Sequence, residues 1–150
     1  MPQISEEKLK RIKKIESTIN KNLFIICVVI TLIAMLMTVI GFFNRGIFPP
    51  SGISIFYIGV LFVYSVHKEM LRWLGEKETE RQGEWFLYIW IGLTLILYII
   101  NFFTKNYFSY SPEGLPIESL KETSIITLEV SVTFVFTRLS KVIRIIIEKR

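Results

Sequence analysis

The chain has 150 residues, of which 51% are hydrophobic and 14% aromatic, and its mean hydropathy is +0.48 with a formal net charge of +5. Hydrophobic residues gathered in long uncharged runs exclude an ordinary soluble domain of this size, whose helices need only one apolar face. Because Cys27 is the one cysteine, the chain is able to form neither an intrachain disulfide nor a cysteine metal cluster. We expect Cys27 to be a small buried residue within an apolar run.

Residues 4–21 predict an amphipathic basic helix. Apolar residues recur at helical spacing among the lysines and arginines: Leu9, Ile12, Ile15 and Ile19. We expect residues 1–21 to form a separate cytoplasmic helix that lies on the membrane surface, with its basic side chains toward anionic lipid headgroups. Nucleic-acid binding is the other explanation of a positive net charge. We do not expect it, because membrane topology accounts for nearly all the basic residues.

Residues 22–150 predict a membrane domain with four transmembrane helices. Two uncharged runs of 21 and 19 residues, Leu23–Phe43 and Trp85–Phe103, match the length that a helix needs to cross a bilayer. They define the first and third predicted spans, residues 22–43 and 84–104.

The second and fourth predicted spans, residues 51–74 and 122–145, carry charged side chains. The second span continues from an apolar stretch through Lys68 and Arg72, whose long side chains are able to reach the headgroups from within a helix. The fourth span contains Glu129. We therefore predict an all-α fold, a polytopic membrane protein built as a four-helix antiparallel bundle and preceded by the amphipathic N-terminal helix.

The distribution of basic residues predicts the orientation of the spans. Of the 18 lysines and arginines, 15 lie in the N-terminal segment, between the second and third spans, or in the C-terminal segment. The positive-inside rule places these three regions, and with them both termini, in the cytoplasm. We expect an integral protein of a bacterial or archaeal cytoplasmic membrane.

Residues that carry common catalytic chemistry are scarce. The chain has one histidine, one cysteine and no aspartate, and it contains no HExxH motif, glycine-rich phosphate loop or nucleophile elbow. His67, near the cytoplasmic end of the second span, is expected to be an interfacial polar residue, with a proton-handling role as the alternative. We therefore expect no enzymatic activity, no cofactor and no metal site.

Glu129 is the ionisable residue that lies deepest in a predicted span. At a rise of ~1.5 Å per residue it lies about 9 Å below the outer end of its helix, and Thr38, Tyr57 and Tyr98 reach nearly the same depth. We predict a polar layer in which a tyrosine hydroxyl, together with Thr38, hydrogen-bonds the Glu129 carboxyl and keeps it neutral. The alternative is an ion- or proton-conducting group, since intramembrane carboxylates often mark pathways.

Small and hydroxyl-bearing residues predict where the spans approach one another. The first span has such a face at Thr31, Ala34, Thr38 and Gly41, and the fourth has one at Ser124, Thr127 and Ser131. Polar or small residues on two sides of the fourth span predict that it is enclosed, either by the other spans or by further copies of itself. We expect a cytoplasmic basic cluster at its inner end, formed by Arg138, Lys141 and Arg144.

These features favour a small non-enzymatic membrane protein that acts by self-assembly or as a subunit of a membrane complex. Its expected partners are the lipid bilayer and either further copies of the chain or another membrane subunit. The alternative is an oligomeric pore of the ion-channel or holin type, with Glu129 lining the path. The basic cluster opposes a cation pore, because it would repel cations at the inner mouth.

Overall fold

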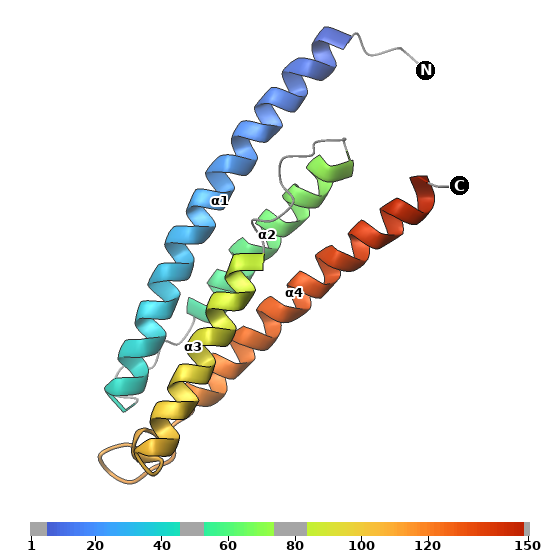
Figure 1. Ribbon diagram of the computed structural model, residues 1–150. Coiled ribbons are helices and arrows are strands. Elements are labelled where there is room, and N and C mark those ends of the chain that lie inside the picture. The colour runs from blue at the N-terminus through green and yellow to red at the C-terminus, as the bar shows by residue number, and fades with distance from the viewer. Residues whose placement is uncertain (1–5, 46–52, 74–83, 149–150) are drawn as a thin grey trace.

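The computed structural model describes residues 6–45, 53–73 and 84–148, and this part of the chain contains helices and no strand. The α-helices are α1 (Glu6–Phe43), α2 (Ile53–Trp73), α3 (Glu84–Phe103) and α4 (Ser119–Glu148), and a short 3-10 helix, η1 (Tyr107–Ser109), lies between α3 and α4. Consecutive α-helices run in opposite directions, so both termini lie at the same end of the bundle (Figure 1). The all-helical prediction is confirmed.

Three of the predicted spans are long and apolar enough to cross a membrane: Arg11–Phe43 within α1, all of α2 and all of α3. Helix α4 has 30 residues and closely follows the predicted fourth span, but it does not meet the same criterion of length and composition. Glu129 and Arg138 are among the charged residues that interrupt its apolar sequence. The structure thus supports membrane-spanning character for three helices.

The basic N-terminal segment is not a separate helix. Helix α1 is continuous from Glu6 to Phe43 and extends the first span in line (Figure 1). The expected boundary at residue 21 is absent because no proline or glycine interrupts the chain there. The predicted apolar stripe is exposed at Ile12, Ile15 and Ile19, whereas Asn20 is buried.

The core lies between the four helices and is rich in aromatic residues. Its centre is formed by residues from every helix, including Ala34, Tyr57, Trp90 and Val130. Helix α1 packs mainly on α2, α3 packs on α4, and α2 also contacts α4. The buried residues of α2 recur every three or four positions, which places them on one stripe of the helix: Tyr57, Leu61, Tyr64, Lys68 and Leu71.

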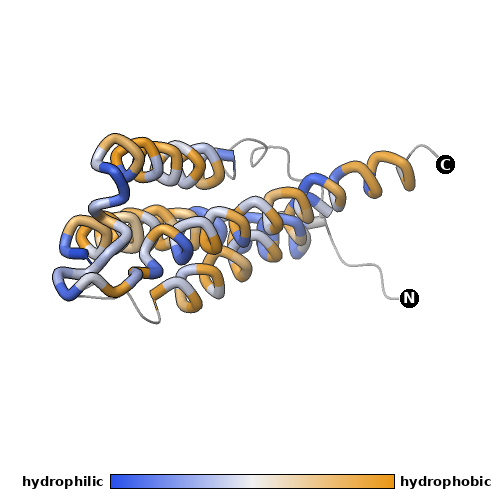
Figure 2. Tube along the Cα trace, turned by 90° about the horizontal axis from the view of Figure 1, so that it is seen from below, coloured by the Kyte–Doolittle hydropathy of each residue, from blue (hydrophilic) through white to orange (hydrophobic). Residues whose placement is uncertain are grey.

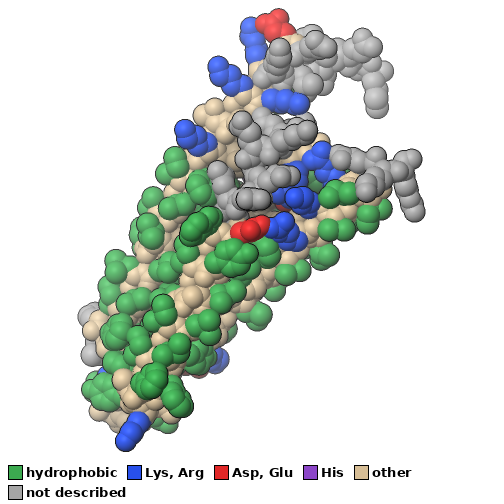
Figure 3. Space-filling model, in the orientation of Figure 1, with side chains coloured by type: hydrophobic (Ala, Val, Ile, Leu, Met, Phe, Trp, Pro, Cys, Tyr) green, Lys and Arg blue, Asp and Glu red, His purple; other side chains and the backbone are tan. Residues whose placement is uncertain are grey.

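The outer surface of the bundle is apolar over most of its length. Large hydrophobic side chains are exposed on all four helices, and hydrophobic residues recur along each helix in Figure 2. In Figure 3 most visible lysines and arginines lie toward the end of the bundle that holds the termini, while hydrophobic side chains cover the rest. An apolar surface with charge gathered at one end suits a bundle surrounded by lipid.

Candidate functional site

The last turns of α2 place four polar side chains on the side that faces α3 and α4. These residues, Tyr64, Lys68, Glu69 and Arg72, are called the charge cluster below. Tyr64, Lys68 and Arg72 follow one another at intervals of one helical turn, and Glu69 lies one turn before Arg72, which brings the four side chains to one side of α2. Tyr64 and Lys68 are buried, and the side chains of Glu69 and Arg72 are only 13% and 12% exposed. Ionisable groups this deep in a bundle are costly unless they are paired, so they indicate a site.

Charges within the cluster do not balance. Arg72 Nη1 lies 2.5 Å from Glu69 Oε1 and forms an ion pair with it. The Lys68 ammonium lies 6.0 Å from the centre of the Tyr64 ring, at the outer limit of a cation–π contact. Within the described residues we find no hydrogen bond or ion pair for that ammonium. Two cations therefore share one carboxylate, and one positive charge is left in excess.

A cavity of about 40 Å³ adjoins the cluster between α2, α3 and α4. All four cluster residues line it, together with hydroxyl-bearing residues that include Thr133 and Thr137 of α4. Three cluster atoms are buried without a hydrogen-bond partner in the described part of the chain: the Tyr64 hydroxyl, Glu69 Oε2 and Arg72 Nε. A single water needs ~10–15 Å³, so the cavity has room for a few atoms of a ligand or for water.

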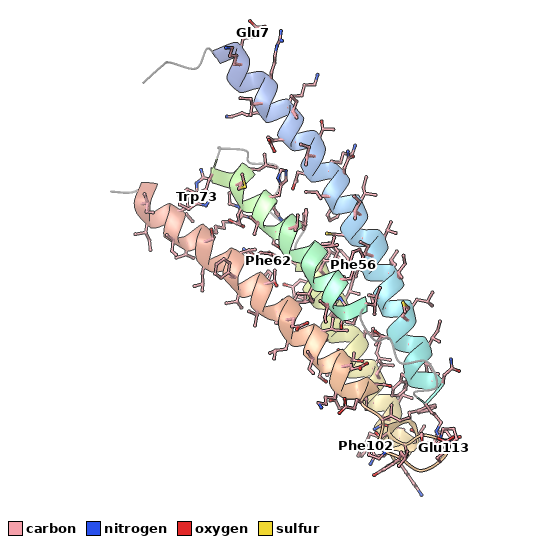
Figure 4. All side chains as sticks on the ribbon, turned by 180° about the vertical axis from the view of Figure 1, so that it is seen from behind. Glu7, Phe56, Phe62, Trp73, Phe102 and Glu113 are labelled. Atoms are coloured by element: carbon pink, nitrogen blue, oxygen red, sulfur yellow. The ribbon has the colours of Figure 1, made fainter. Side chains whose placement is uncertain are left out.

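An apolar groove of about 650 Å³ lies beside this cavity, between α2 and α4. Its walls are largely hydrophobic: Phe62, Val66, Met70 and Trp73 from α2, and Val132 and Phe136 from α4. The cavity and the groove share Ser65, Glu69, Thr133 and Thr137 as lining residues. Figure 4 shows Phe62 and Trp73 on the side of α2 turned toward α4, whereas Phe56 lies toward α1.

The predicted basic cluster at the inner end of α4 is divided among different partners. Arg138 forms an ion pair with Glu84 at the start of α3. Arg144 donates a hydrogen bond to the backbone carbonyl of Arg72. Lys141 is half-buried and also has an interaction partner. Arg138 and Arg144 thus connect α4 to α3 and α2 and extend the positive character of the charge cluster.

His67 connects α2 to the N-terminal half of α1. Its Nε2 atom lies 3.6 Å from Glu16 Oε2 and 3.4 Å from the Glu16 backbone oxygen, and both side chains are partly buried. This geometry gives His67 a partner on α1. The long α1 is therefore held against α2 beyond the apolar part of the first span.

The predicted polar layer around Glu129 is not assembled. Glu129 is exposed on α4. The Tyr57 hydroxyl instead accepts a hydrogen bond from Trp90 Nε1 at 2.8 Å, and the Tyr98 hydroxyl pairs with Ser124 Oγ at 2.9 Å. Matched depth is not sufficient to bring side chains together, because the direction in which each leaves its helix decides the contact.

Thr38, the fourth residue expected in the polar layer, bonds within its own helix. Its hydroxyl donates to the Ala34 carbonyl at 2.8 Å, and the Thr31 hydroxyl donates to the Cys27 carbonyl at 2.6 Å. The small face predicted for the first span, which also includes Gly41, is buried along its length. These residues therefore lie in the packed side of α1 and do not reach Glu129.

The small residues of α4 contact α3. Thr127 Oγ1 lies 2.6 Å from Thr94 Oγ1, one turn away from the pair formed by Ser124 and Tyr98. Ser131 is half-buried and donates to the Thr127 carbonyl at 2.7 Å. Within one protomer α4 is thus packed against α3 and α2 and open on its outer side. Enclosure by the other three helices, one of the two predicted arrangements, does not occur.

At the opposite end of the bundle Arg45 holds the connection between α3 and α4. Its Nε and Nη2 atoms donate to the backbone carbonyls of Tyr110 and Ser111, each at 2.7 Å, and its guanidinium lies 4.3 Å from the centre of the Tyr107 ring. The Ser111 hydroxyl, and more weakly the Arg45 charge, lower the pKa of Glu113 in the same loop. Arg45 and its contacts with Tyr107, Tyr110 and Ser111 are called the Arg45 clasp below. We did not predict these contacts from the sequence.

The charge cluster was also missed from the sequence, where Lys68 and Arg72 were interpreted as side chains that reach outward to headgroups. A usable signal was present: Lys68 follows Tyr57, Leu61 and Tyr64 at helical spacing on one stripe. Where the chain is described, no group of three or more histidine, cysteine, aspartate or glutamate side chains is placed to hold a metal ion.

Comparison of the chain with protein-family models, with curated proteins and with solved structures gives no match.

Proposed function

We propose that this protein is a non-enzymatic integral membrane protein that crosses the membrane four times and acts by assembling with further copies of itself. One observation carries the proposal. Glu129 is exposed on α4 beside Leu128 and Val132, which are exposed hydrophobic residues. An isolated protomer would present this carboxyl to lipid, and contact with a second copy removes it from lipid.

Support for a fourth crossing comes from the packing of α4. The pairs Thr94–Thr127 and Tyr98–Ser124 fix α4 alongside the middle of α3, which is apolar enough to span a membrane. Val130 of α4 lies in the shared core. A helix packed along spanning helices lies at the same depth, and here its own hydrogen bonds satisfy its backbone.

The energetic reason for assembly is the position of Glu129. An acidic residue at the centre of a span costs ~2.5–3.5 kcal/mol in insertion experiments, and such residues usually face other protein. Ile125 and Val132 lie about one turn before and after Glu129, and both are exposed. This face of α4 therefore offers an apolar contact with one polar group at its centre, a composition suited to a symmetric helix–helix interface.

The orientation that we propose places both termini in the cytoplasm. Basic side chains concentrate at the end of the bundle where α1 begins and α4 ends (Figure 3). The positive-inside rule assigns that end to the cytoplasm. The Arg45 clasp then faces the outside.

An oligomeric pore is the second candidate function, and the exposure of Glu129 favours it over a pore within one protomer. A ring of protomers would gather one Glu129 carboxyl per chain around a shared axis. The proposals differ in ion flux. For a pore, Glu129→Gln should change flux through liposomes markedly, whereas an assembly without a pore should show the flux of protein-free liposomes with either residue.

The direct test is the oligomeric state of the full chain in nanodiscs or mild detergent. We expect wild type to form an oligomer and Glu129→Leu to weaken association roughly 3- to 20-fold, the range given by the loss of one interhelical hydrogen bond. Glu113→Gln is the matched control, because it removes an exposed carboxylate from the outer loop. A wild-type chain that stays monomeric as its concentration in the membrane rises would overturn the proposal.

A further inference from the structure

We infer that the charge cluster and the apolar groove beside it form a binding site for one anionic phospholipid. The phosphate group occupies the cavity between α2, α3 and α4, and one acyl chain lies in the groove between α2 and α4. The lipid comes from the leaflet at the Trp73 end of α2. The groove shares Val132 with the α4 face around Glu129, but binding of the lipid does not require self-assembly.

The cavity end of the site has the chemistry of an anion receptor. Two buried groups there are able to donate a hydrogen bond and lack an acceptor among the described residues, the Tyr64 hydroxyl and Arg72 Nε–H. The Lys68 ammonium beside them makes no ion pair with a described residue. Tyr64 and Lys68 are more than nine-tenths buried. Charged donors converging on a small space match the several acceptor oxygens of a phosphate group.

The sign of the charge selects an anion over a cation. Among the described residues that line the cavity, only Glu69 carries a carboxylate, and one of its oxygens is already paired with Arg72. The Lys68 ammonium has no ion pair of its own among the described residues, and Arg138 close by is paired with Glu84. An anionic ligand supplies the missing charge, whereas water satisfies hydrogen bonds but leaves the buried charge unbalanced.

The groove selects a ligand with a long apolar chain. It runs along α2 from Phe62 to Trp73, a rise of ~17 Å at ~1.5 Å per residue, which is close to half the thickness of a bilayer. Its volume of about 650 Å³ is within the range of small-molecule sites. The groove meets the cavity at Glu69, so a single amphipathic molecule is able to occupy both.

The orientation of the site in the membrane agrees with this occupant. Cavity residues Lys68 and Arg72 lie toward the Trp73 end of α2, while the groove extends to Phe62 nearer the middle of the helix. A phospholipid in the leaflet at the Trp73 end has its phosphate at the level of Lys68 and Arg72, and its acyl chain extends from there toward the level of Phe62. Trp73 lines the groove where a lipid would pass from headgroup to chain.

The experiment measures thermal unfolding of the detergent-purified full chain while a lipid is added. A ligand that binds the folded state raises the unfolding midpoint in a saturable way. We expect dioleoylphosphatidylglycerol to do so, and dioleoylphosphatidylcholine to bind at least tenfold more weakly because it carries no net charge. Dihexanoylphosphatidylglycerol and inorganic phosphate, which lack the long chain, should each also bind at least tenfold more weakly.

Two variants divide the site into its parts. Lys68→Met should reduce the apparent affinity for dioleoylphosphatidylglycerol roughly tenfold or more, since hydrogen bonds to charged groups are strong in a buried site. Lys21→Met is the matched control, because Lys21 is exposed on α1 at the same end of the bundle. Val66→Trp, which fills the groove without changing charge, should also weaken binding of the long-chain lipid.

Lys68→Met also tests whether loss of binding reflects loss of folding. Because it removes the charge of a buried residue that forms no ion pair with a described residue, it should unfold no earlier than wild type in lipid-free detergent. Three results would overturn the inference: equal stabilisation by the anionic and zwitterionic long-chain lipids, equal losses from Lys68→Met and Lys21→Met, or saturation by inorganic phosphate at the affinity of the long-chain lipid. The last result would assign the cavity to a free anion.

Discussion

Individual polar side chains in this bundle bond to their own helix, to a neighbouring helix, or, as Ser124 and Thr127 do, to both. Thr31 and Thr38 return to carbonyls one turn back, whereas Tyr57 meets Trp90 across the core at 2.8 Å. The hydrogen-bond partners that we predicted for these residues from the sequence are not the ones that they have. Pairing depends on the rotation of each helix about its axis, and a single sequence fixes that rotation only for strongly patterned helices.

The bond between Tyr57 and Trp90 predicts a measurable loss of stability. Tyr57→Phe keeps the aromatic ring but leaves the Trp90 indole N–H buried without an acceptor, so we expect a loss of about 1–3 kcal/mol in the free energy of unfolding. Denaturant unfolding in detergent micelles measures it. Tyr88→Phe is the control, because that tyrosine is exposed. Equal stability of the two variants would show that the hydroxyl of Tyr57 contributes nothing.

The ends of α2 and α3 lie close to the positions predicted from the sequence. The second and third spans were expected at residues 51–74 and 84–104, and the helices are Ile53–Trp73 and Glu84–Phe103. These ends follow turn residues and breaks in hydropathy that are local in sequence. The straight continuation of α1 through its basic segment was not predicted, because an apolar stripe on a basic helix suits a membrane surface as well as an extension of a bundle.

At the scale of elements, the Arg45 clasp predicts a local effect on the connection between α3 and α4. Arg45→Lys keeps the charge but loses the planar fork that donates to two carbonyls, so the loop should open more often. We expect amide exchange at Gly114 and Ile117, both hydrogen-bonded within the loop, to rise roughly tenfold. Hydrogen–deuterium exchange of the detergent-solubilised protein measures it.

Exchange in the core helices should stay unchanged in Arg45→Lys. Lys121→Met provides the comparison, because Lys121 is an exposed cation at the same end of the molecule. Faster exchange throughout the bundle would mean that Arg45 supports global stability and does not act as a local clasp.

For the molecule as a whole, composition predicted a helical membrane protein, but it did not predict where polarity would be buried. Hydropathy and the positive-inside rule use local sums along the chain; they predicted four spans and a charged end, and three of the four helices are long and apolar enough to cross a membrane. The charge cluster needs three helices to come together around Lys68, and that contact between distant segments leaves only a weak periodic signal. We therefore did not predict that the Lys68 side chain is buried in the bundle or that Glu129 is exposed on its surface.

We propose that the two faces of α4 have different roles, one in packing within the bundle and the other in assembly. Toward the other helices, Thr127 and Val130 hold α4 in the bundle. On the outer side, Glu129 and its apolar neighbours are exposed, and we propose that a second copy contacts them. The proposed assembly through this face requires α4 from two copies to lie in contact at the level of Glu129.

Disulfide cross-linking in native membranes tests that claim most directly. With Cys27→Ser as background, a cysteine introduced by Ile125→Cys lies one turn from Glu129 on the proposed interface. Ile96→Cys on α3 is the control, because Ile96 is comparably exposed and lies at a similar level, as the Thr94–Thr127 and Tyr98–Ser124 pairs show. We predict oxidative dimers from Ile125→Cys and few from Ile96→Cys. Equal cross-linking at the two positions, or none at Ile125→Cys, would contradict assembly through α4.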